Sequence, residues 1–324
     1  MSTIIELATG STKTSAFGSG VNKALAVEAQ SVFEVKEEVA NLRKYAARVE
    51  RTEKAQLEME KYNKMTISNG GDIEDGNDSY SSVWTVIDNQ ELITFNSPDV
   101  VSVGFKITPR LLRQARDDPA SFLARYRRKV AFDLAKKEDI YLGSYLTNNA
   151  TNVVYAGAAT SKITLGSGSV FTVELFESML DDMKENEYEP THFIGTSKVI
   201  GQLRRDARLL NDSDFSVAIK EDGSTVTQIG DVMVHEVKGT DIIPNITTGA
   251  GAGSGTTAIM IDWEGAFGIC DFLKSAGANP VSISVGKPDP TLEGANYHRI
   301  LGQEEMQAQI LDQNAIIVAH VNKA

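Results

Sequence analysis

The chain has 324 residues, of which 41% are hydrophobic and 23% are charged, a composition typical of a globular protein with a sizeable core. Its formal net charge of −12 and its lack of a basic tail argue against packaging of nucleic acid by direct charge neutralisation. Apolar runs are too short for a membrane span and the first residues lack a secretory signal pattern, while the single cysteine, Cys270, argues against an internal disulfide framework.

An N-terminal arm with a helix is expected over residues 1–65. Residues 8–20 are small and polar, which is typical of a flexible arm. Residues 22–62 carry apolar side chains at alternating steps of three and four residues, from Val32 to Val49. Because this seam is shorter than three heptads, it predicts a helix packed on its own or a neighbouring domain, and not an independent coiled coil.

An extended, acidic segment is expected at 66–106. Two runs within it, 83–87 and 100–103, are rich in β-branched and aromatic residues, which predicts a long two-stranded loop. Turn signals lie at 70–71, 76–77 and 97–98. Between residues 66 and 105 the chain has seven acidic residues and neither lysine nor arginine, so this segment carries a net charge of −7.

The next segment inverts the charge. Between Lys106 and Thr147, ten basic residues outnumber five acidic ones, for a net charge of +5. Asp118 is a natural N-cap and Pro119 a natural first helical residue. An apolar stripe with mostly helical spacing follows, so we predict a helix over 119–146, about 40 Å long.

A mixed α/β region is expected after this helix. Thr172 is predicted to cap a helix whose apolar face is directed inward, and Ser197 a second one with Val199, Ile200 and Leu203 inward. The inward residues of the first helix are Leu175, Phe176, Met179, Leu180 and Met183. Strands are predicted at 192–194, 231–237, 258–262, 281–285, 305–311 and 316–321, and a flexible glycine-rich loop at 247–257.

No motif for catalysis, a cofactor or a metal is recognisable. The histidines at 192, 235, 298 and 320 lack metal-ligand spacing, and Cys270 has no nucleophile signature, so structural roles and a buried inert thiol are expected. The glycine run 249–255 is followed by a strand and not by a helix, which argues against a phosphate loop. The acidic turn 72–78 lacks the register of a calcium loop.

The basic cluster formed by Arg125, Arg127, Arg128 and Lys129 spans more than one helix face. A nucleic-acid site needs basic residues on one face, so a solvated surface or ion pairs between subunits are the favoured readings.

In this order of elements the chain resembles the major capsid protein of tailed bacteriophages and related viruses, which has the Hong Kong 97 fold. The stretches that carry the resemblance are 103–148, 171–205 and 299–321. It implies an α+β fold with an N-terminal arm over 1–65, an extended β-loop (E-loop) over 66–106 and a long spine helix. The helix belongs to a peripheral (P) domain over 107–195, which the closing strands at 299–324 complete, and an axial (A) domain spans 196–298.

The resemblance implies a structural protein and not an enzyme. Copies would assemble into hexamers and pentamers of an icosahedral shell that encloses double-stranded DNA without reading its sequence. Portal, scaffolding or decoration proteins would be further partners, and no membrane or cofactor would be needed. The location would be the virion, assembled in the host cytoplasm. An encapsulin-like compartment for a protein cargo and a soluble enzyme without a recognisable motif are the alternatives.

Two departures from the family bear on assembly chemistry. No lysine lies between Lys64 and Lys106, which argues against the E-loop cross-link that some members form. About 65 residues precede the loop, so scaffolding is expected to be separate or absent.

The charge inversion at residue 106 predicts that the acidic loop of one copy lies across the basic helix region of its neighbour. The predicted contact residues are Asp72, Glu74, Asp75, Asp78, Asp88 and Glu91 on the loop, and Arg125, Arg127, Arg128 and Lys129 on the helix.

Overall fold

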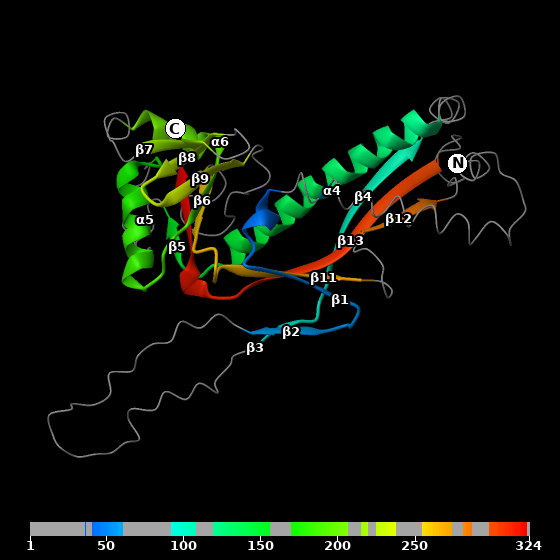
Figure 1. Cartoon of the computed structure of the whole chain (residues 1–324), viewed down its shortest axis with the longest axis horizontal. Coiled ribbons are helices and arrows are strands. Elements are labelled where there is room, and N and C mark those ends of the chain that lie inside the picture. Colours follow the sequence, from blue (N-terminus) through cyan, green and yellow to red (C-terminus); the bar gives the residue numbers. More distant parts are fainter. Residues whose placement is uncertain are drawn as a thin grey trace, which may run out of the picture.

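The computed structural model describes residue 36 and the ranges 41–60, 92–107, 119–155, 170–206, 215–219, 225–237, 255–273, 281–286 and 298–322. Two β-sheets and three α-helices form most of the described part (Figure 1). None of the described helices is both long enough and apolar enough to cross a membrane.

The first sheet is built around β13 (His298–Ile310). On one side β13 pairs antiparallel with β4 (Asp99–Ile107), and on the other with β11 (Phe267–Phe272) and β12 (Val281–Gly286). The short strand β1 (Arg48–Thr52) extends the sheet, parallel to β11.

The long helix α4 (Pro119–Asn149) lies along β4 and β13 (Figure 1). Val130, Leu134 and Leu142 are buried on its inner face. The predicted helix over 119–146 is therefore confirmed, and of its apolar stripe Val130 and Leu134 are buried and Tyr141 and Tyr145 partly buried.

The second sheet has seven strands in the order β5-β14-β10-β6-β9-β8-β7. Their bounds are β5 (Val153–Tyr155), β14 (Ile316–Asn322), β10 (Gly255–Ile261), β6 (His192–Thr196), β9 (Val232–Val237), β8 (Thr225–Ile229) and β7 (Phe215–Ile219). Helices α5 (Val173–Glu185) and α6 (Ser197–Arg205) cover one face of this sheet and share a core with it. Apolar residues on the other face of this sheet belong to the same hydrophobic core as the inner face of α4.

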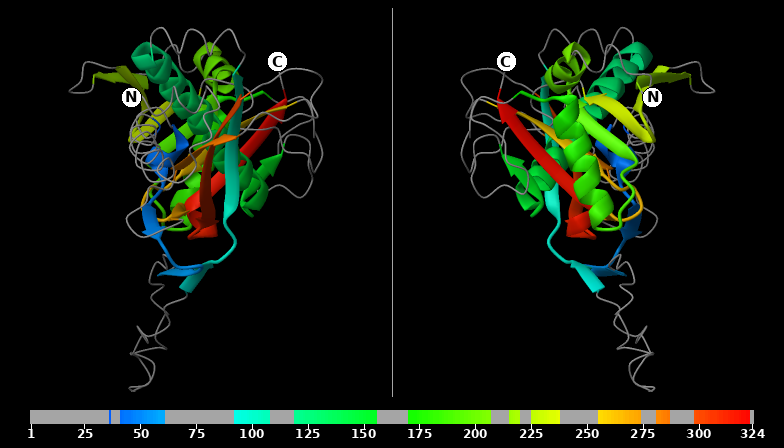
Figure 2. Two further views of the ribbon diagram at one scale, coloured as in Figure 1. Left: turned by 90° about the vertical axis from the view of Figure 1, so that its right-hand side faces the viewer. Right: turned by 90° about the vertical axis from the view of Figure 1, so that its left-hand side faces the viewer.

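A third, two-stranded sheet is not hydrogen-bonded to either of these sheets. It pairs β2 (Leu57–Glu60) antiparallel with β3 (Leu92–Phe95), and it lies below the larger sheets in the views of Figures 1 and 2. Met59 and Phe95 pack there against Cys270 and Phe272 of β11. The tip of the predicted E-loop, between these two strands, lies outside the described residues.

The predicted helix over 22–62 is wrong in its second half. A 3-10 helix covers Leu42–Tyr45, and the strands β1 (Arg48–Thr52) and β2 (Leu57–Glu60) follow. The N–H of Ala47 donates to the carbonyl of Phe267 at 2.9 Å, and β1 continues from there along β11. Pairing with a distant strand has overridden the local helical pattern. Apart from Lys36, which is helical, residues 22–40 lie outside the described residues.

The two predicted helix caps differ in outcome. The Thr172 hydroxyl accepts a hydrogen bond from the Leu175 N–H at 3.2 Å, which confirms the first cap. At the second helix the N-cap is Thr196, without a side-chain cap bond, and the hydroxyl of Ser197 instead donates to Glu236 at 2.7 Å. Val199, Ile200 and Leu203 are buried, as predicted.

The predicted strands are confirmed in type, with shifted ends, except that 83–87 lies outside the described residues. The run 100–103 is part of β4 and pairs with β13 in the first sheet. The sequence reading missed β3 (Leu92–Phe95), β5, β7, β8 and β11. The predicted P and A domain boundaries stay a prediction, and the seven-stranded sheet takes strands from both ranges.

Candidate functional site

Five charged side chains are buried together where the N-terminal stretch meets α4 and the first sheet. This buried charge cluster consists of Lys36, Arg43, Glu138, Asp271 and Glu304. Arg43 is 7% exposed and the other four are fully buried. Four separate parts of the chain supply them: the N-terminal stretch, α4, β11 and β13.

The two basic residues of the cluster share Glu138. Lys36 Nζ lies 2.8 Å from Glu138 Oε2 and also donates to Glu304 Oε1. Arg43 Nη1 donates to Glu138 Oε1 at 2.8 Å and to Asp271 Oδ1 at 3.1 Å, and its Nη2 donates to Asp271 Oδ2. Charge-assisted bonds of this kind are among the strongest in proteins, and the Arg43–Asp271 pair has the two-pronged form.

The backbone around Arg43 is fixed by contacts of its own. The carboxylate of Asp139, next to Glu138 on α4, accepts the N–H groups of Asn41 at 3.0 Å and Leu42 at 2.8 Å. The Tyr45 ring contacts His192 and His235 of the second sheet, with centroids 5.2 and 4.6 Å apart. The stretch from Asn41 to Tyr45 therefore ties α4 to both large sheets.

The cluster contains three acids and two bases, and the pKa values reflect this imbalance. Burial raises the pKa of Glu304 to about 7, helped by the charges of Glu138 and Asp271 and opposed by Lys36. For Glu138, burial acts upward too, but Lys36 and Arg43 together outweigh it and lower the pKa. Glu304 is therefore the acid that takes up a proton near neutral pH, while Glu138 stays ionised.

This asymmetry predicts that the fold is more stable at about pH 5.5 than at about pH 8. The pKa of Glu304 is raised on folding, so the folded protein binds more protons than the unfolded chain between the ordinary value of 4.5 and about 7. Stability is therefore lost as the pH rises through that window, and Glu304 alone contributes about 2 kcal/mol between the two conditions. Asp139 acts in the same direction, since burial raises its pKa to about 6.

Urea denaturation at the two pH values measures this difference. The Glu304→Gln variant should lose most of it, whereas Glu305→Gln, on the next and less buried residue of β13, should keep it. Equal pH dependence in both variants would show that another group is responsible.

The sequence reading missed this cluster, although one signal pointed to it. Glu138 follows Val130 and Leu134 at steps of four residues, so it falls on the buried stripe of α4. A carboxylate on a buried face requires a partner. The identity of the partners depends on segments far away in the sequence.

The structure places few of the predicted contact residues. The six acidic residues, from Asp72 to Glu91, lie outside the described residues, and of the four basic ones on α4 the side chains of Arg128 and Lys129 are described. Both are exposed, and Lys129 Nζ lies 5.0 Å from the centre of the Phe105 ring. The proposed contact between copies stays a prediction.

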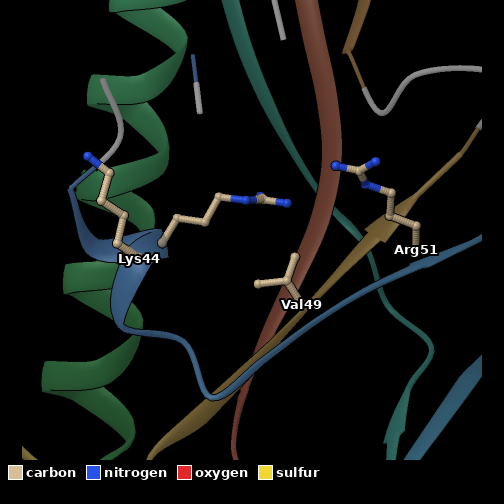
Figure 3. Close-up of a pocket in the computed structure, with 4 residues that line it drawn as sticks. Lys44, Val49 and Arg51 are labelled. Carbon is tan, nitrogen blue, oxygen red and sulfur yellow. The ribbon is translucent and has the colours of Figure 1, made fainter. Parts of the chain in front are cut away.

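A basic hollow of about 540 Å³ opens beside the buried charge cluster, lined by Arg43, Lys44, Val49 and Arg51. Figure 3 shows Val49 between the side chains of Lys44 and Arg51. Arg51 is 47% exposed in its side chain, and its Nε lies 3.8 Å from Asp271. Positive charge therefore reaches the surface above the cluster.

The described residues show no arrangement for metal or thiol chemistry. Within that part of the chain, no three His, Cys, Asp or Glu side chains are placed to hold a metal ion. Cys270 is buried, and burial together with Asp271 and Glu50 raises the pKa of its thiol to about 12, which agrees with an inert thiol. His320 bonds to Thr257 at 3.0 Å, a structural contact within the second sheet.

No protein-family model and no curated protein matches the chain. Solved structures match it along most of its length at low identity. The holo-SrpI encapsulin complex from Synechococcus elongatus PCC 7942 has a TM-score of 0.53 at 12% identity, over 86% of both chains. The procapsid of satellite phage P4 has a TM-score of 0.51 at 12% identity, over 91% of this chain and 99% of the other.

The head of Helicobacter pylori bacteriophage KHP40 has a TM-score of 0.51 at 11% identity, over 85% of this chain and 87% of the other. All three likenesses cover more than four-fifths of this chain. The protein therefore has the fold of bacteriophage capsid and encapsulin shells, the Hong Kong 97 fold that its sequence resembles.

Proposed function

We propose that the protein is a major capsid protein, whose copies form hexamers and pentamers of a closed icosahedral shell around double-stranded DNA. The observation that carries this proposal is the extent of the structural match, which includes 99% of the compared chain of the phage P4 procapsid. A fold by itself does not fix a function. Here the function is mechanical, and it needs the whole fold and no local active site.

The charge of the chain supports a shell around DNA and not a protein that condenses it. With a net charge of −12, the chain as a whole is a poor neutraliser of phosphates. DNA would then have to be driven into the shell by a motor. Portal, scaffolding or decoration proteins are the further partners in this proposal, and the virion is the location.

An encapsulin-like compartment is the second candidate, since the SrpI encapsulin has a TM-score of 0.53 with this chain. The two candidates differ in content and not in architecture. Particles of the capsid would hold nuclease-protected DNA, whereas particles of the compartment would hold a specific protein.

Negative-stain images and size-exclusion chromatography of the purified protein test the proposal. We expect shells, capsomers or sheets, and then nuclease treatment and mass spectrometry of the particle contents separate the two candidates. A stable small monomer that acts on small substrates would contradict both and favour an enzyme.

We further propose that the acidic loop of one copy, within 66–106, lies across α4 of its neighbour. Arg127→Glu combined with Arg128→Glu should then reduce assembly most strongly at low salt, because each reversed contact costs roughly 1 kcal/mol and is repeated around the shell. Light scattering across a salt series measures assembly. Lys184→Glu combined with Lys198→Glu, exposed on α5 and α6, is the matched control. Unchanged assembly of the α4 variant at every salt concentration would rule out this contact.

A further inference from the structure

We propose that a groove with an acidic rim beside α5 binds the basic segment 108–118 of a second copy, the segment that joins β4 to α4. This α5 groove lies between α5, the stretch that leads into β6, and the turn between β8 and β9. The inference rests on the proposed function and deepens it, because it names a contact between copies that is separate from that of the acidic loop.

The inside of the α5 groove is apolar. The groove has a volume of about 680 Å³. Phe176 and Leu180 of α5 line one side, and Ile229 and Val232, at the ends of β8 and β9, line another. Phe176 and Val232 are buried in the core, whereas Leu180 and Ile229 are only partly buried. The groove therefore offers apolar surface to a side chain from outside.

Further apolar residues are exposed next to the groove. The N–H of Met233 donates to the carbonyl of Thr191 at 2.9 Å, and the N–H of Trp263 donates to the Thr191 hydroxyl at 3.0 Å. Thr191 itself lines the groove. Met233 is 41% exposed and Trp263 45%. Tryptophan and methionine are enriched in protein interfaces, so this end of the second sheet has the composition of a docking surface.

The charged residues that line the groove are mostly acidic. Glu177, Glu187, Glu189 and Asp231 are four acids, and Lys184 is the one base among the described lining residues, for a net charge of −3. α5 faces the viewer in the right-hand view of Figure 2. A partner for this surface needs apolar side chains flanked by positive charge, because complementary charges guide encounter and register.

Segment 108–118 has this composition. It contains Arg110, Arg113 and Arg116 with no acidic residue between them, and Leu111 and Leu112 lie between the first two arginines. Arginine is suited to such a contact because its guanidinium group binds carboxylates in a two-pronged manner. These three arginines are not used by the contact proposed between the acidic loop and α4. Their charge of +3 equals the excess of negative charge in the groove.

The segment is too short to reach the groove of its own copy. It begins after Ile107 of β4 and ends before Pro119 of α4, and both lie at one end of the molecule, whereas α5 lies past the other end of α4 (Figure 1). α4 has 31 residues and is therefore about 46 Å long. A segment of about eleven residues that is anchored at both ends extends at most about 20 Å from them. The occupant must therefore come from another copy.

Binding of a synthetic peptide with the sequence of residues 106–118 tests the groove directly. Fluorescence anisotropy of the labelled peptide measures its affinity for the full-length protein. Glu189→Lys combined with Asp231→Lys, both exposed, should weaken binding by about tenfold or more, because two attractive contacts become repulsive. Asp181→Lys combined with Glu185→Lys is the matched control, since both are exposed on α5 outside the groove lining and change the net charge equally. This control should bind the peptide within about twofold of wild type.

Reversal of charge in the peptide completes this test. A peptide with Arg110→Glu and Arg113→Glu should not bind the wild-type protein and should regain affinity for the Glu189→Lys, Asp231→Lys variant. A peptide with Leu111→Ser and Leu112→Ser should bind weakly to both proteins, because the groove has lost its apolar partner. Equal weakening by the groove variant and its control would show attraction to an acidic protein in general and would overturn the proposal.

Disulfide cross-linking tests the contact between whole copies. Full-length proteins with Arg113→Cys and with Glu189→Cys are mixed before assembly and oxidised, and we expect a covalent dimer on a denaturing gel. Glu185→Cys in place of Glu189→Cys should give little dimer, and Cys270 is buried and does not contribute. Negative-stain images of the same samples show whether shells form. Shells without the cross-link would overturn this contact and leave the proposed function intact, whereas peptide binding without particles would support the groove and contradict the shell.

Discussion

Replacing Arg43 with methionine is expected to lower the free energy of unfolding by about 3–5 kcal/mol, because it removes one partner of a buried ion-pair network. Arg43 supplies bonds to both Glu138 and Asp271, and both carboxylates are fully buried. Methionine has a similar shape and leaves little empty space. The loss is therefore mainly that of charge compensation: three carboxylates would face Lys36 alone.

Urea denaturation at about pH 7.5 measures this change. Arg48→Met, on an exposed arginine of β1, is the matched control and should change stability by less than about 0.5 kcal/mol. Adding Asp271→Asn to Arg43→Met removes one uncompensated charge and should recover part of the loss. If Arg43→Met behaved like Arg48→Met, the network would not hold the N-terminal stretch in solution.

Gly302→Ala is expected to destabilise the protein by about 1–3 kcal/mol, because it overpacks the contact between α4 and β13. A Cβ atom at this position would lie 2.8 Å from Cγ1 of Val130 and 3.4 Å from Cδ1 of Leu134. Val130 is buried, and its β-branched side chain has little freedom to rotate away. Either the helix or the strand would have to move.

Gly104→Ala is the control, on the neighbouring strand β4. A Cβ atom there would meet Leu301 at 3.8 Å, an ordinary contact, so stability should stay the same or increase slightly. Combining Gly302→Ala with Val130→Ala should cost less than the sum of the two single changes, because the smaller side chain makes room. Thermal and urea unfolding of all four variants tests this; additive losses would show that the helix does not press on Gly302.

The helices and most core strands could be predicted from the sequence because their signals are local. Pro119 and the apolar stripe that follows define α4, and Thr172 caps α5. In both cases the residues that determine the element lie within the element or next to it. The resemblance to capsid proteins likewise rested on the order of such elements.

The stretch after Leu42 was mispredicted because its structure is determined from a distance. Its three-four spacing fits a helix, but backbone bonds to β11 turn residues 48–52 into a strand whose side chains are largely exposed. The buried charge cluster was missed for the same reason. Lys36, Glu138 and Glu304 come from three distant segments, and their pairing follows from tertiary packing that local patterns do not contain.

The position of β13 and β14 in their sheets has a consequence for biosynthesis. Each is an inner strand: β13 lies between β4 and the strands β11 and β12, and β14 between β5 and β10. Both follow every other described strand in the chain, so the ribosome makes them last. Until then, both sheets of the nascent chain have unpaired edges, which are prone to aggregation and are natural binding sites for chaperones. Neither sheet can therefore close before synthesis has passed residue 298.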